Sequence, residues 1–106
     1  MPASRREKIE AMLVDDPTDP FLRFSLAMEL EKEGRHEESL AQHAALGQET
    51  TPYVPSFFMA AQQLARLGRI EEARERLRAG IEIARQQGNA HAAGEMGEFL
   101  ASLGSQ

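Results

Sequence analysis

The side chains able to perform chemistry in this 106-residue chain are few: three histidines, paired carboxylates and scattered serines. His36 and His43 lie seven residues apart on one expected helix, which separates their backbones by about 10 Å. That distance prevents joint chelation of a metal unless other ligands converge, and the chain has no cysteine to supply them. His91 begins another segment. We therefore expect no metal site, and we expect His36 and His43 to take part in packing between helices.

The other candidates for catalysis also lack the required arrangement. Glu37 and Glu38 are adjacent, so on a helix their side chains point about 100° apart and cannot act on one substrate. No serine follows the strand-to-helix pattern of a nucleophile elbow, and no glycine-rich phosphate loop is present. The sequence therefore predicts no catalytic residue, no cofactor and no enzymatic activity.

Composition and charge narrow the class of function further. Apolar residues make up 42% of the chain and charged residues 27%, which is ordinary for a globular protein. The net charge is −5, and residues 1–53 carry six basic and eleven acidic side chains, whereas residues 54–106 carry six of each. A nucleic-acid surface needs a concentrated basic patch, which this distribution does not provide. No apolar run approaches the ~20 residues of a membrane span. We expect a cytoplasmic protein that binds neither nucleic acid nor membrane.

The sequence predicts α-helices along the whole chain. Alanine, leucine, glutamate and arginine dominate, and β-branched residues are scarce. Ser4 followed by Glu7 forms a capping-box pattern, Asp19 stands at a second helix start, and Gly34 and Gly68 are natural helix terminators. Glycine and proline residues, which end helices, divide the chain into six predicted helices at about residues 4–14, 20–33, 36–48, 54–67, 70–87 and 90–103.

The chain also repeats itself with a period of 34 residues. Residues 20–47 placed over residues 54–81 without gaps give eight identities in 28 positions. The matched pairs are Phe24/Phe58, Ala27/Ala61, Leu30/Leu64, Gly34/Gly68, Arg35/Arg69, Glu37/Glu71, Glu38/Glu72 and Ala45/Ala79. Residues 64–68 recur at 100–104, two residues out of phase, and Ile9, Met12 and Leu13 fall where Leu77, Gly80 and Ile81 fall two periods later.

The most similar part of the repeat is the turn between two helices of one unit. Gly34 and Gly68 end the first helix of their units, and the acidic pair that follows each favours the positive end of the next helix dipole. The small residue after that pair, Ser39 or Ala73, lets the two helices approach closely. Each unit is therefore a helical hairpin.

These features resemble the tetratricopeptide repeat family. The resemblance rests on the 34-residue period, the stretch "DPTD" before a first helix, the mid-helix small residues Ala27 and Ala61, the turn glycines and Phe57. Arg23 departs from it, since the family has a large aromatic there. The resemblance implies an all-α, right-handed α-solenoid of about six helices in one domain, 1–106. Its parts would be an N-terminal half-unit helix (1–18), a first repeat (19–52), a second repeat (53–87) and a C-terminal capping helix (88–106).

The resemblance also implies a function: binding a peptide or partner protein in a concave groove lined by the first helices of the repeats, as a scaffold or adaptor. The groove would be mostly apolar with a basic edge, suited to an amphipathic helix or an extended apolar peptide. The implied groove residues are Phe21, Phe24, Met28, Lys32, Pro55, Phe58, Met59, Gln62, Arg66, His91, Glu95 and Glu98.

Three alternatives stay open at this point. Phe24, Met28 and Phe58 could pack within the stack and bind nothing. The chain could be a homo-oligomer that self-associates through its C-terminal helix, with Met96, Phe99 and Leu103 as anchors. It could also be a complete monomeric adaptor.

Overall fold

A computed structural model describes residues 3–104 and contains six α-helices, with no strand in that range. The predicted all-α class is confirmed, and each helix lies within two residues of its expected bounds. The expected half-unit 1–18 and cap 88–106 each include two residues, 1–2 and 105–106, that lie outside the described part. The helices are α1 (Arg5–Asp15), α2 (Pro20–Lys32), α3 (His36–Gly47), α4 (Val54–Arg66), α5 (Ile70–Gln86) and α6 (Ala90–Leu103).

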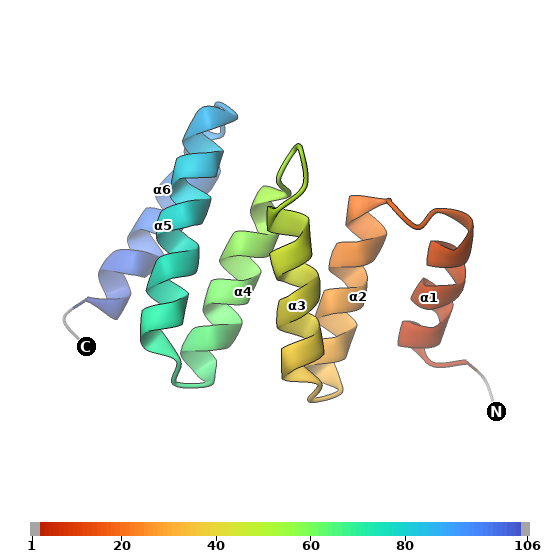
Figure 1. Ribbon diagram of the computed structural model, residues 1–106. Helices are drawn as coiled ribbons and strands as arrows, with labels where there is room; N and C mark the ends of the chain where they lie inside the picture. The colour runs from red at the N-terminus through yellow and green to blue at the C-terminus, as the bar shows by residue number, and fades with distance from the viewer. Residues whose placement is uncertain (1–2, 105–106) are drawn as a thin grey trace.

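Consecutive helices run antiparallel and form two layers, as Figure 1 shows: α1, α3 and α5 in one layer and α2, α4 and α6 in the other. Each helix packs against its neighbour in sequence, and α4 also contacts α6. The molecule is elongated, with extents of 47 × 30 × 18 Å. This arrangement is an α-solenoid, in which each unit contacts only the adjacent ones.

Local sequence signals account for where the helices begin and end. Ser4 caps α1 in a complete capping box with Glu7, and the Asp19 carboxylate accepts a hydrogen bond of 3.0 Å from the backbone N–H of Leu22. Gly34 and Gly68 adopt left-handed φ angles of 77° and 79°, which glycine tolerates without a Cβ penalty. The two repeated stretches therefore build the same helix-ending turn twice.

Most of the apolar core lies in the second half of the chain. Phe57 of α4 packs against Gly80 in the middle of α5, and Met96 of α6 covers the same glycine. A Cβ at Gly80 would stand 2.6 Å from Phe57 Cβ and 2.7 Å from Met96 Sδ, which is closer than carbon and sulfur atoms approach. The Arg76 guanidinium lies 4.5 Å from the centre of the Phe57 ring, a cation–π contact.

The junction between the two repeats combines apolar contacts, such as Phe57 against Gly47, with a set of polar ones. Ser39 Oγ of α3 donates a hydrogen bond of 2.6 Å to the Ala27 carbonyl of α2 and lies 3.3 Å from Gln63 Oε1 of α4. The Gln63 amide nitrogen lies 3.0 Å from His36 Nδ1 of α3. His43 Nδ1 lies 3.1 Å from Ser56 Oγ of α4. These residues, His36, Ser39, His43, Ser56 and Gln63, are called the polar seam below.

The C-terminal helix corrects one sequence-based expectation. Met96 is fully buried and Leu103 is 8% exposed, because both pack into the core cluster with α4 and α5. Neither can act as an exposed anchor for a second chain without local unfolding. Phe99, the third expected anchor, is half-buried and contacts Phe58.

Candidate functional site

The face formed by α2, α4 and α6 carries an open hollow at its C-terminal end. The hollow is about 330 Å³ and lies between α4 and α6, lined by Phe58, Glu95, Glu98, Phe99 and Ser102. The Phe58 and Phe99 rings lie 5.8 Å apart at a tilted angle, a favourable aromatic geometry. The structure thus brings together three residues that the sequence placed in the groove: Phe58, Glu95 and Glu98.

The hollow is acidic as well as aromatic. Glu98 has no lysine or arginine within ion-pair distance among residues 3–104. Glu95 Oε1 lies 3.3 Å from His91 Nε2 one turn earlier on α6, an interaction that carries charge only when the imidazole is protonated. An exposed aromatic pair beside two carboxylates favours a ligand that combines apolar and cationic groups.

The middle of the same face is ion-paired. Arg66 of α4 pairs with Glu31 of α2 across the two helices. Lys32 Nζ lies 3.3 Å from Glu29 Oε1, and the same carboxylate oxygen lies 2.7 Å from Arg5 Nε of α1. The expected basic edge is therefore largely neutralised by the chain's own carboxylates.

Two of the expected groove aromatics lie elsewhere. The Phe24 ring packs 5.6 Å from the buried His43 ring and 5.5 Å from the Tyr53 ring, so it serves the packing of α2 on α3. Phe21 is 64% exposed and lines a separate hollow between α1 and α2. Phe24 thus follows the alternative in which a groove residue packs within the stack.

The remaining expected groove residues are accessible on α2 and α4. Met28, Met59 and Gln62 are half-buried, and Pro55 is exposed in the first turn of α4. None of them makes a hydrogen bond or ion pair through its side chain within residues 3–104. They supply apolar and amide side chains on α2 and α4.

The buried position of His43 indicates a role in packing. His43 is 1% exposed, and burial lowers its pKa from 6.5 to about 4, so the ring is neutral near pH 7. His43 Nε2 has no hydrogen-bond partner, whereas Nδ1 lies beside Ser56. Within the described residues, no three histidine or acidic side chains gather as metal ligands would.

Sequence reasoning missed Ser102 and gave Phe99 a different role. Both follow Glu95 and Glu98 at helical spacing, since Phe99 is four residues after Glu95 and Ser102 is four after Glu98. That spacing alone was enough to place them on or beside the face of the two glutamates. Their contact with Phe58 depends on the crossing of α4 and α6, which a sequence does not display.

Comparison with solved structures identifies the fold. The solution NMR structure of a tetratricopeptide repeat domain protein from Salinibacter ruber matches with a TM-score of 0.76 and 28% sequence identity. The match covers 83% of this chain and 89% of that one. No protein-family model and no curated protein matches the sequence.

This fold generally mediates protein–protein interactions and is typically non-enzymatic. None of the helices in residues 3–104 has the length and apolarity that crossing a membrane requires. The 34-residue period, the two-layer helix array and the structural match agree. The chain has the tetratricopeptide repeat fold, as its sequence predicted.

Proposed function

We propose that the chain is a protein–protein interaction module that binds a segment of a partner protein along the face of α2, α4 and α6. The observation that carries this proposal is the open hollow in which Phe58 and Phe99 stand beside Glu95 and Glu98. Glu98 has no basic partner within the described residues, so a cationic ligand gains an ion pair there without displacing one.

The partner segment that fits this face combines apolar and basic side chains. Its apolar side chain would occupy the hollow on the Phe58–Phe99 pair, and a lysine or arginine would reach the two carboxylates. Met28, Met59 and Gln62 would continue the contact toward α2, where thioether side chains adapt to varied ligand shapes. Toward Lys32 and Arg66, a ligand would meet groups already paired with Glu29 and Glu31.

A displayed library of random peptides tests the proposal directly. Selection on the wild-type chain should enrich peptides in which basic and apolar residues occur together. The double variant Glu95→Lys/Glu98→Lys should lose these peptides at least tenfold, since reversing two charges replaces attraction with repulsion. Both glutamates are exposed, so the variant should keep the helical circular dichroism of the wild type.

A matched control separates this face from the other layer. Glu75 is exposed on α5, and Glu75→Lys changes the net charge in the same direction without touching the hollow. Peptides that bind the wild type and Glu75→Lys equally but not the double variant would locate the site. Enriched peptides that lack basic residues, or that bind the double variant equally well, would contradict it.

A further inference from the structure

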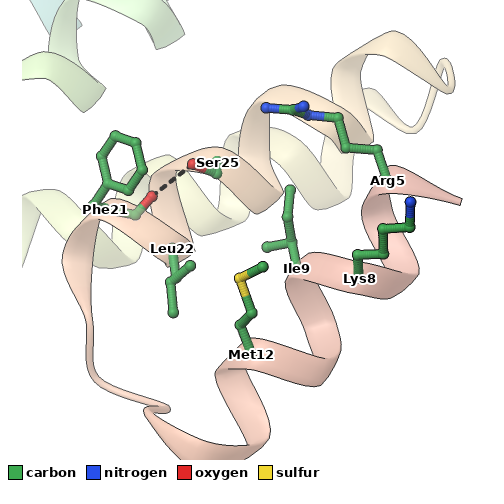
Figure 2. A pocket seen from close by; sticks show the side chains of 7 residues that line it. All are labelled: Arg5, Lys8, Ile9, Met12, Phe21, Leu22 and Ser25. Atoms are coloured by element: carbon green, nitrogen blue, oxygen red, sulfur yellow. Dashed lines mark hydrogen bonds between the residues drawn. The ribbon is translucent and has the colours of Figure 1, made fainter.

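A second hollow lies at the opposite end of the molecule, between α1 and α2. It is about 230 Å³, and its walls are mainly apolar. Ile9 and Met12 of α1 and Leu22 of α2 point toward one another across it, as Figure 2 shows. Met12 is 54% exposed and Phe21, at the start of α2, is 64% exposed. Apolar side chains this exposed at one hollow indicate a surface that another helix covers.

The second repeat shows which helix packs against a helix in the position of α1. By the repeat, α1 corresponds to α5, because Ile9 and Met12 fall two periods before Leu77 and Gly80. In the second repeat, Phe57 of α4 lies against Gly80 and shares the core cluster with Leu77, and Met96 of α6 contacts Gly80 from its other side. The contacting face of α4 is fully buried and consists of Val54, Phe57, Ala61 and Leu64. A helix equivalent to α4 is therefore the natural cover of α1.

The helix equivalent to α4 is α6, thirty-six residues later in the sequence. Its matching face consists of Ala90, Ala93, Gly97 and Leu100, all of them exposed or half-buried. No side chain of the described part lies within 4 Å of the place where a Cβ would stand on Gly97. Ala93 and Leu100 touch the core cluster at one side. Thus α6 leaves partly uncovered the face that α4 buries on α5.

The side-chain sizes on the two uncovered faces are complementary. Inside the chain, the large Phe57 of α4 meets the small Gly80 of α5. At the corresponding positions, α6 has the small Ala93 and α1 has the large Met12. In each pairing one large and one small residue meet, so the space is filled. The large residue comes from α4 inside the chain and would come from α1 in the pairing of α1 with α6.

We propose that copies of this chain associate head to tail, with α6 of one copy in the α1–α2 hollow of the next. Ala93 then packs on Met12 of the neighbour, and the two helices complete one repeat between them. The interface is heterologous, so it leaves one hollow and one α6 face free at the ends of every open assembly. This association uses the ends of the molecule and is independent of the peptide-binding face proposed above.

Sedimentation equilibrium of two blocking variants tests the proposal. Met12→Glu places a charge in the hollow, and Gly97→Arg places a bulky cation on the α6 face. Both sites are accessible, and replacing a helical glycine favours the helix, so both variants should fold. Between about 10 and about 500 µM, the wild-type average mass should rise to at least twice 11.8 kDa, while each variant alone stays at 11.8 kDa.

The decisive measurement is the mixture of the two variants. Met12→Glu keeps an intact α6 face and Gly97→Arg keeps an intact hollow, so an equimolar mixture should form a one-to-one dimer and nothing larger. Ala11→Glu, on another face of α1, is the control and should assemble like the wild type. A monomeric wild type, a blocking variant that still self-associates, or a mixture that stays monomeric would each overturn the proposal.

Discussion

His43 makes the stability of the chain depend on pH in a specific direction. Its ring is 1% exposed, and desolvation lowers the pKa from 6.5 to about 4. Above pH 6.5 the imidazole is neutral in both the folded and the unfolded chain and contributes no pH dependence. As the pH falls from 6.5 toward 4, the unfolded chain binds a proton that the folded chain excludes. The free energy of unfolding therefore decreases across that window.

The magnitude follows from the pKa difference. A lowering from 6.5 to about 4 corresponds to about 3 kcal/mol once both states are protonated, at about 1.4 kcal/mol per pKa unit. At about pH 5, where the folded ring is still mostly neutral, the loss is about 2 kcal/mol. That is a large fraction of the free energy of unfolding of a typical domain, which is roughly 5–15 kcal/mol.

Urea unfolding followed by circular dichroism measures this loss at about pH 7.5 and about pH 5. His43→Asn keeps an amide near Ser56 but has no titrating group, so it should lose about 2 kcal/mol less than the wild type between the two conditions. His91→Asn removes an exposed histidine and should follow the wild type. The carboxylates are the same in all three chains, so their contribution cancels when the stability losses of the chains are compared.

One outcome of the urea experiment would contradict a neutral, buried His43. If wild type and His43→Asn lose the same stability to within about 0.5 kcal/mol, the buried ring does not exclude the proton. The neutral state assigned to the His43 imidazole would then be wrong, whatever the absolute stability of the variant.

Two further predictions concern packing and helix termination. Gly80→Ala should destabilise the chain by about 1–3 kcal/mol in urea unfolding, because its Cβ overlaps Phe57, whereas Gly94→Ala, with open space around it, should stabilise by up to about 1 kcal/mol; effects of equal sign would contradict the close packing at Gly80. Arg74 Nη2 donates hydrogen bonds to the carbonyls of Leu103, at 3.2 Å, and Gly104, at 2.6 Å, so Arg74→Met should cost about 1–2 kcal/mol and accelerate amide hydrogen exchange in the last turn of α6; unchanged exchange there would show that this turn does not need the arginine.

The helices and turns were predictable because their signals are local. Ser4 with Glu7, Asp19, and the glycines at 34 and 68 each act through contacts within a few residues, and the structure confirms each of them. The repeat added the antiparallel pairing, since equal spacing of similar hairpins leaves one regular way to stack them. The fold therefore needed no information beyond the chain's own periodicity.

The site was less predictable because it depends on which helices cross and at what angle. Phe24 and Phe58 occupy equivalent repeat positions, yet Phe24 packs on His43 while Phe58 lines an open hollow. Their neighbours differ because α3 offers His43 where α5 offers Leu77, one period later. Arg66 illustrates the same limit, since its partner Glu31 is distant in sequence and belongs to another helix.

The polar seam has a consequence for what the chain exposes when it partly unfolds. The free energies of the interfaces in such an array add approximately, so the array opens at its weakest junction. Each hydrogen bond in the seam contributes only roughly 0.5–1.5 kcal/mol, because water replaces it in the opened state. The large apolar cluster of α4, α5 and α6 holds together without them. A fluctuation that separates α3 from α4 therefore presents serine, glutamine and histidine to the solvent, together with Leu40 and the Phe57 ring, which lies against Gly47 of α3. The surface uncovered by this opening is mixed, and its polar part lowers the tendency of the open molecule to associate with its neighbours.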